Sequence, residues 1–327
     1  MVSTENSEQA RAIIETYLLD GERRYDRTKV AELAGVEPET TRRLWGALGF
    51  PAGPDDAVEY TDADVAAVRG FRGLAVFEDT DPRAAAAAAR TLGQSMARLA
   101  EWQAELVASE ILERADGSAE SVRAATESAV AQFEELQKYA WRRHLAAAIT
   151  RSLDGNGGSE DSTRTLAVGF ADMVGYTRLT RHLHPDELGM LLEAFESTTT
   201  AAITQNGGWV IKNVGDEVMF AAETPLQAAK IALAVQESTM MVGGTPELRV
   251  AVAYGPALQR FGDLYGSVVN IAARLTGVAR PGTVLIDDAT ASALADEPQY
   301  SIRHLRSVRV RGFNRLRPHV LRLRERR

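Results

Sequence analysis

A run of small and polar residues divides this chain into two parts with different patterns of apolar residues. The run is Asp154-Gly-Asn-Gly-Gly-Ser-Glu-Asp-Ser162, a composition typical of flexible linkers. Before it, apolar residues recur at helical spacing, whereas after it short apolar segments alternate with turns and helices. The pattern predicts an all-helical domain at residues 1–153, a linker at 154–163 and a second domain at 164–327. The 327 residues are enough for each domain to bury its own core.

Residues 25–70 contain a helix-turn-helix pattern. Two short helices are expected on either side of Ala34-Gly35-Val36, and the second should start near Pro38. Together with Tyr60–Val68, the segment resembles the winged helix-turn-helix of MerR-type regulators. The second helix offers two arginines, but the surrounding segment is not basic and is poorly equipped to attract phosphates. This favours a regulatory packing module over a DNA-binding one.

Two long helices are expected over residues 82–114 and 118–153, with Gly117 as the natural break between them. Apolar residues fall close to helical spacing in both segments. We interpret these stripes as the core of a helix bundle rather than as a cofactor site. The region 82–153 would thus complete the helical domain.

Composition excludes several classes of protein. The chain has no cysteine, so disulfides, thiolate nucleophiles and zinc–sulfur sites are absent. It shows no signal peptide at its N-terminus and no apolar run that approaches the ~18 residues needed to cross a bilayer. We therefore expect a cytoplasmic protein with no membrane partner. The ten arginines of residues 301–327 alternate with apolar residues, which favours strands with exposed arginines over a nucleic-acid-binding tail.

The second domain is predicted to be an α+β fold. Its expected elements are strand Thr165–Ala171, helix Pro185–Thr204, a hairpin, helix 225–240, strand Leu248–Tyr254, helix 267–278, strand Thr283–Asp287 and arginine-rich closing strands. The order β-α-β-β-α-β favours a sandwich of the ferredoxin-like type.

The hairpin Trp209–Phe220 carries charged residues at its tip. Apolar residues run up to Lys212, Gly215-Asp216 form the turn, and a second apolar run follows. The chain has only four lysines against 33 arginines, so a lysine beside a tight turn suggests a specific use for a compact ammonium group. An ordinary hairpin with solvated charges is the alternative.

Two aspartates of this domain are candidates for a metal site. Asp172 ends the first strand, and Asp216 sits at the hairpin tip. Because the first and central strands are neighbours in a β-α-β-β sheet, the two carboxylates can lie side by side. Paired carboxylates without a nearby histidine or cysteine suit Mg²⁺ or Mn²⁺. Two unrelated turn aspartates remain the alternative at this point.

A third segment, Asp263-Leu-Tyr-Gly-Ser-Val-Val-Asn-Ile-Ala-Ala-Arg274, adds the decisive pattern. Asn270 and Arg274 lie four residues apart and hence on one face of a helix. This segment resembles a signature of class III nucleotide cyclases, and Phe170–Thr177 and Ile211–Asp216 resemble the family's other two signatures. All three occur in the family's order, and the resemblance covers about residues 164–321.

The resemblance implies a role for each matching residue in an adenylate cyclase, which converts ATP to 3′,5′-cyclic AMP and pyrophosphate. Asp172 and Asp216 would hold two metal ions, Mg²⁺ or Mn²⁺, at each site. Lys212 and Asp263 would recognise adenine, since guanine presents the reverse pattern of donors and acceptors. The residues that would act on the ribose and phosphates are Asn270, Arg274 and Arg311; the last stands where the family usually has a lysine.

The resemblance also implies a homodimer with two equivalent active sites at its interface. One chain would supply the metal-binding aspartates, and the other the base-recognising pair with Asn270 and Arg274. Lys212 and Asp216 flank one tight turn, which makes it hard for both to face the same nucleotide.

Some actinobacterial cyclases have an N-terminal helical domain of this kind that modulates activity, in some cases with pH. We expect residues 140–163 to act as a switch, with His144 inside it and His182 and His184 near the site as candidate proton sensors. An apolar bundle could also admit a small hydrophobic effector. Two alternatives are a guanylate cyclase and a DNA-binding regulator whose cyclase-like half senses nucleotide.

Overall fold

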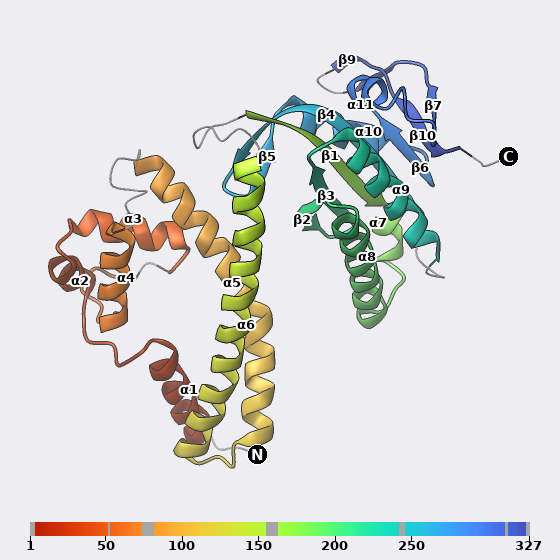
Figure 1. The fold of residues 1–327 in the computed structure, drawn as a ribbon. Helices are drawn as coiled ribbons and strands as arrows, with labels where there is room; N and C mark the ends of the chain where they lie inside the picture. The colour runs from red at the N-terminus through yellow and green to blue at the C-terminus, as the bar shows by residue number, and fades with distance from the viewer. Residues whose placement is uncertain are drawn as a thin grey trace. The chain divides into compact units, whose positions relative to one another are not determined.

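The computed structural model describes residues 4–51, 53–73, 82–154, 163–241, 246–310 and 313–324 (Figure 1). Contacts between residues divide the chain into two units, residues 1–152 and 153–327, and each is described by itself. Most of the expected linker lies outside the described residues.

The first unit contains helices and no strand in its described part, apart from an isolated β-bridge between Tyr25 and Tyr60. Its helices are α1 (Thr4–Leu18), α2 (Arg27–Ala34), α3 (Pro38–Leu48), α4 (Asp62–Arg72), α5 (Pro82–Arg114) and α6 (Ala119–Asp154). Asp26 caps α2 by accepting a hydrogen bond from the backbone N–H of Lys29, and Gly35, with φ at 69°, ends it. None of the described helices is both long enough and apolar enough to cross a membrane.

The arginines of α3 are engaged in ion pairs within the unit. Arg42 lies 3.2 Å from Glu39 and 3.0 Å from Asp55, and Arg43 lies 3.1 Å from Glu39. A recognition helix needs its cations for phosphates and base edges. Pairing both of them with carboxylates argues against the alternative of a DNA-binding regulator.

The expected helix-bundle core of α5 and α6 is only partly present. Further along the helices, Trp102 of α5 meets the ring of Phe133 of α6, and Gln137 donates a hydrogen bond to Gln103 at 2.9 Å. The apolar cluster lies near the loop that joins the two helices. Ile111 and Val122 are buried there, and Ile13 of α1 packs against them. Several other residues of the predicted stripes are exposed instead: Leu92, Met96, Leu106, Leu112, Leu136, Tyr139 and Leu145. The prediction of a helix-bundle core therefore holds for only part of the stripes, because helical periodicity identifies an apolar face but does not supply the element that covers it.

The second unit is built on one mixed sheet with strand order β2-β3-β1-β4-β6-β10-β7. Its strands are β1 (Thr163–Met173), β2 (Trp209–Val214), β3 (Glu217–Ala222), β4 (Leu248–Arg260), β6 (Thr283–Ile286), β7 (Tyr300–His304) and β10 (His319–Leu323). Strand β1 pairs antiparallel with both β3 and β4, while β4 and β6 run parallel. The predicted α+β fold with β-α-β-β-α-β order is confirmed.

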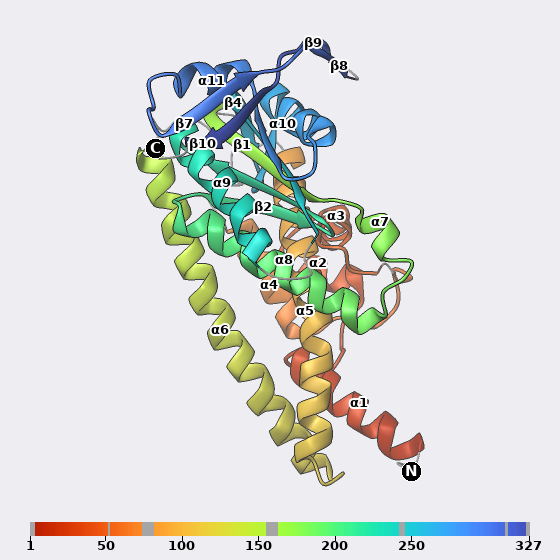
Figure 2. The ribbon, with the colours of Figure 1, turned by 90° about the vertical axis from the view of Figure 1, so that its right-hand side faces the viewer.

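Helices cover both faces of this sheet (Figure 2). Helices α8 (Pro185–Gln205) and α9 (Pro225–Met241) pack on one face, and α10 (Ser267–Val278) packs on the other. The side chains of strand β3 are buried on both faces of the sheet. Val218 and Phe220 are buried toward α8 and α9, whereas Met219 is buried in the cluster that contains residues of α10. The alternation of side chains along the strand therefore fills two cores.

Strand β4 is longer than the sequence predicts. Gly255 and Pro256 are poor strand formers, but the pairing of β1 with β4 continues as far as Leu258. Short elements that the sequence analysis did not predict are α7 (Tyr176–Leu179), β5 (Asp263–Tyr265) and α11 (Asp288–Ala293), whereas β8 (Val308–Val310) and β9 (Phe313–Leu316) lie within the predicted arginine-rich closing strands. Strand β5 turns back on β4, so Asp263 belongs to a hairpin at the edge of the sheet.

Gly169 leaves room for the buried ring of Phe220, and this contact can be tested. A Cβ at position 169 would lie 2.1 Å from Phe220 Cζ. We expect Gly169→Ala to lower the free energy of unfolding of the full chain by about 2–3 kcal/mol through overpacking. Gly189→Ala is the matched control, because a Cβ at this exposed position in α8 meets nothing within 4 Å. It should be neutral or stabilise by up to about 1 kcal/mol, and equal losses in urea denaturation would contradict the packing argument.

Candidate active site

The register of three strands places Asp172 between a carboxylate and a guanidinium group. Asp172 on β1 pairs with Glu217 on β3 and with Arg249 on β4. Residues directly opposite each other in a sheet share a face, so the three side chains are neighbours. Arg249 Nη1 lies 3.6 Å from Asp172 Oδ2. The aspartate is thus held near the end of β1, between two paired strands, with the Arg249 guanidinium beside it.

Asp216 lies at the tip of the β2–β3 hairpin, next to the end of β1. Gly215, with φ at 61°, supplies the left-handed conformation that the tight turn requires. The backbone N–H of Met173 donates to the carbonyl of Asp216 at 3.0 Å, which ties the tip to β1. The structure therefore brings the two predicted metal-binding aspartates together.

Electrostatics show an excess of negative charge at this point. Burial raises the pKa of Asp172, and the charge of Asp216 raises it further, while Arg249 opposes both effects. The pKa of Glu217 is also raised, mainly by burial and then by Asp172 and Asp216. A divalent cation would offset this repulsion, and the carboxylate oxygens are the hard ligands that Mg²⁺ and Mn²⁺ prefer. Within the described residues, no three acidic or histidine side chains are arranged as ligands of one ion.

Lys212 and Asp263 form an ion pair although 51 residues separate them in the chain. Lys212 Nζ lies 2.6 Å from Asp263 Oδ2, and Asp263 Oδ1 accepts a hydrogen bond from the N–H of Leu264 at 2.8 Å. The two side chains are 44% and 28% exposed, so a ligand can reach both. The predicted base-recognising pair is thus brought together.

Asn270 and Arg274 lie one turn apart on α10, and both are exposed. Arg274 forms no ion pair with any described residue, which leaves its guanidinium available to an anion. No hydrogen bond or ion pair among the described residues joins these two side chains to Asp172 or to Lys212. Arg311, the remaining predicted site residue, lies outside the described residues.

Sequence analysis missed Arg249 and Glu217 as members of the site. Each directly follows a residue or turn that was recognised, but only the strand register shows that both face Asp172. A charged residue at the start of an apolar strand, as in Leu248-Arg249-Val250, is the signal that could have identified Arg249.

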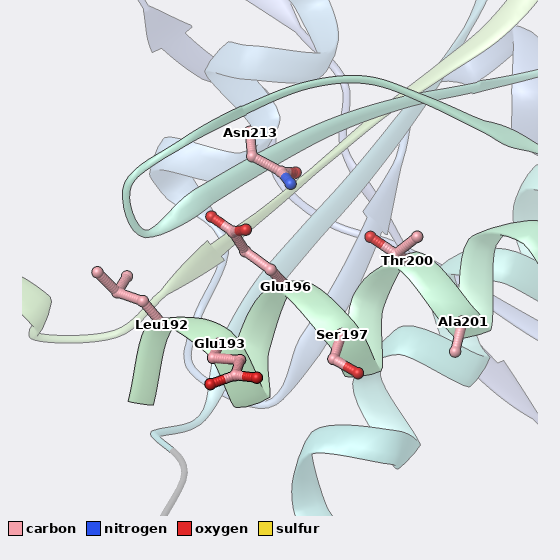
Figure 3. A pocket seen from close by; sticks show the side chains of 7 residues that line it. All are labelled: Leu192, Glu193, Glu196, Ser197, Thr200, Ala201 and Asn213. Atoms are coloured by element: carbon pink, nitrogen blue, oxygen red, sulfur yellow. The ribbon is translucent and has the colours of Figure 1, made fainter. Parts of the chain in front are cut away.

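A shallow hollow between α8 and β2 is separate from these residues (Figure 3). Asn213 of β2 points from the strand toward Glu196 of α8, and Glu193 and Thr200 line the same hollow. Asn213 lies opposite Val218, so its side chain is on the face of the sheet that α8 covers. Glu217 precedes Val218 in β3 and pairs with Asp172, so these two side chains are on the opposite face. The hollow contains none of the predicted site residues.

Residues 159–322 match the family of adenylate and guanylate cyclase catalytic domains. An adenylate cyclase of Streptomyces coelicolor is 40% identical over 284 residues, which cover 86% of this chain and 74% of that protein. An adenylate cyclase of Glutamicibacter nicotianae is 35% identical over 328 residues, covering 95% and 81%. A protein of Mycobacterium tuberculosis named as a pH-sensitive adenylate cyclase is 31% identical over 305 residues, covering 88% and 76%.

The raised pKa of Asp172 predicts a stability gain on removing its charge. When the pKa of a carboxyl group is higher in the folded than in the unfolded chain, ionising that group lowers the free energy of unfolding. The loss disappears when the pH is below the unfolded pKa of about 3.9, because the group is then protonated in both states. In the presence of a chelator, Asp172→Asn should therefore raise the free energy of unfolding at pH 7. The gain should shrink as the pH falls toward 4.

Urea denaturation at several pH values measures this difference. Asp296→Asn is the control, because Asp296 is exposed and in the same unit. A loss of stability at pH 7 in the Asp172 variant, with no change in the control, would show that Arg249 already balances the site.

Proposed function

This chain belongs to the adenylate and guanylate cyclase family, and we infer that it is an adenylate cyclase that converts ATP to 3′,5′-cyclic AMP and pyrophosphate. The observation that carries this conclusion is its 40% identity with an adenylate cyclase over 86% of the chain. Both the family and the activity expected from the sequence are confirmed. The Lys212–Asp263 pair, which has the donor and acceptor that adenine requires, further favours ATP over the guanylate cyclase alternative.

The family normally uses divalent metal ions. We propose that Asp172 and Asp216 hold two of them, Mg²⁺ or Mn²⁺, at each site. Such ions, when bound, activate the ribose 3′-hydroxyl for attack on the α-phosphorus and neutralise charge on the triphosphate. The chain's own contribution is to hold the two residues side by side: strand pairing places Asp172, and the hydrogen bond from the Met173 N–H to the Asp216 carbonyl places the backbone of Asp216.

Adenine recognition is assigned to the ion pair of Lys212 and Asp263. The ammonium group would donate to N1 of adenine, and the carboxylate would accept from the 6-amino group. Guanine has a protonated N1 and a 6-oxo group. Its N1–H donor would therefore face the ammonium donor of Lys212, and its O6 acceptor would face the carboxylate acceptor of Asp263. The existing ion pair supports this role because it holds the donor and the acceptor side by side before the nucleotide arrives.

Asn270 and Arg274 are assigned to the ribose and to the reacting phosphoryl group. Their exposure on one face of α10 supports this assignment, since a nucleotide bound there would meet both. Arg274 would stabilise the negative charge that develops as the 3′-oxygen attacks. Arg311 is assigned to the terminal phosphates, as a charge-conserving replacement for the family's usual lysine.

The family acts as dimers. We propose a homodimer with two sites at its interface, in which one chain supplies Asp172 and Asp216 and the other supplies Lys212, Asp263, Asn270 and Arg274. The hairpin supports this division. The backbone of Asp216 is tied to β1 through Met173, whereas the Lys212 side chain pairs with Asp263 of β5, so the two residues are held by different neighbours.

We propose further that the helical domain regulates the reaction, by pH or by a small apolar effector. The similarity to a cyclase named as pH-sensitive supports the first mode. The exposed apolar side chains of Trp141, Leu145 and Ile149 on α6 support the second. The candidate proton sensors His144, His182 and His184 are all exposed.

The division of the site between two chains predicts complementation. Asp216→Ala and Asn270→Ala should each abolish cyclic AMP formation from ATP, because each variant lacks one half of every site. When the two variants are mixed in equal amounts and allowed to exchange subunits, half of the dimers are mixed, and each of these has one intact site. Activity should return to roughly one quarter of wild type, a consequence of the two-fold symmetry.

The assay supplies ATP or GTP with Mg²⁺ or Mn²⁺ and measures cyclic nucleotide and pyrophosphate. Wild type should prefer ATP. Mixing either variant with itself is the control and should restore nothing. Failure of the mixture to recover, when sedimentation shows that mixed dimers form, would mean that each site is built within one chain.

Regulation by the helical domain predicts that removing it changes the pH profile. Residues 160–327 alone should show a different rate, and a flatter profile between about pH 5 and 8, than the full chain. Initial rates with saturating ATP measure both profiles. Identical profiles at identical rates would contradict a regulatory role of the helical domain.

A further inference from the structure

The turn between β4 and β5 has a backbone conformation that does not suit its first residue. Phe261 and Gly262 form a two-residue loop in which φ is 50° and 81°. Two positive φ values in succession are the type I′ pattern, which favours Asn-Gly or Asp-Gly. The other non-glycine residue with positive φ in the described chain is Asp20, a residue type that tolerates this conformation. A phenylalanine here is strained, and its retention calls for a reason.

The residues on either side of this turn are directly opposite each other. Arg260 ends β4, Asp263 begins β5, and the two form a cross-strand pair. Opposite residues share a face of the hairpin, and a guanidinium group facing a carboxylate normally binds it, often through two hydrogen bonds. Arg260 is therefore the natural partner of Asp263.

The structure shows different partners for both residues. The guanidinium carbon of Arg260 lies 5.1 Å from the centre of the Phe261 ring. Asp263 instead binds Lys212 at 2.6 Å. No ion pair joins Arg260 to Asp263 in the described part of the chain. The ring of Phe261 thus holds the cation that would otherwise compete for Asp263.

We propose that Phe261 is a positioning residue that determines base specificity. Its ring holds the Arg260 guanidinium away from Asp263, so the carboxylate stays available to Lys212 and to the 6-amino group of adenine. Without the ring, Arg260 turns to Asp263, occupies its oxygens and neutralises its charge. The inference rests on the proposed role of Lys212 and Asp263 in adenine recognition.

Replacing the ring tests this role. Phe261→Leu keeps an apolar side chain and the strained turn but removes the π face. We expect kcat/KM for ATP to fall by about 2- to 5-fold, mainly through KM, with a similar fall in the ratio of ATP to GTP turnover. Phe261→Tyr keeps the ring and should retain wild-type values.

The mechanism through Arg260 is tested by a double-mutant cycle. Arg260→Met alone should leave kcat/KM and the ATP/GTP ratio close to wild type, because no guanidinium remains to compete for Asp263. For the same reason, Phe261→Leu should have no effect in the Arg260→Met background. Losses of equal size in both backgrounds would overturn the proposal.

Phe261→Asn separates the ring from the turn. Asparagine suits the first position of a type I′ turn, so this variant should melt at a higher temperature than wild type. It should nevertheless lose base discrimination as Phe261→Leu does. A wild-type ratio of ATP to GTP turnover in the asparagine variant would overturn the proposed role of Phe261 but not the proposed adenylate cyclase activity. A wild-type chain that makes no cyclic AMP from ATP would overturn the proposed function, and this inference with it.

Discussion

The antiparallel pairing of β1 with both of its neighbours is the constraint on which the rest of the second unit depends. It buries the centre of the sheet on two faces and leaves Asp172 at the strand's end, between Glu217 and Arg249. A carboxylate at such a place is costly to ionise, and the raised pKa of Asp172 reflects this cost. The fold cannot avoid this ionisation cost by moving Asp172 into solvent, because shifting the pairing of β1 would disrupt both cores.

Patterns local in sequence predicted much of this architecture. The hairpin around Gly215 and the helix that bears Asn270 follow from turn chemistry and helical spacing, and both are present as expected. The proximity of Lys212 and Asp263 came from the family resemblance, since nothing in their own segments indicates it. Arg249 and Glu217 were missed because strand register between distant segments leaves no trace in periodicity.

In the helical unit, the sequence predicted more burial than the structure shows. Apolar spacing in α5 and α6 correctly predicted two long helices, but only part of the stripes predicted to form a helix-bundle core is buried. Helix formation depends on residues within a few turns, whereas burial depends on which other element happens to lie alongside. Trp141 on α6, for example, is 62% exposed among the described residues of this unit.

The continuous pairing of β1 with β4, from Thr163 to Met173, has a mechanical consequence. The strand's first residue follows the linker, and Asp172 lies near its other end. A slip of β1 by one residue would turn every buried side chain to the wrong face, so the strand cannot slide under load. Under the proposed regulation, a signal arriving through the linker would therefore move the sheet as a rigid body. Control would be exercised by how two whole catalytic units meet, with the carboxylate geometry inside each left intact.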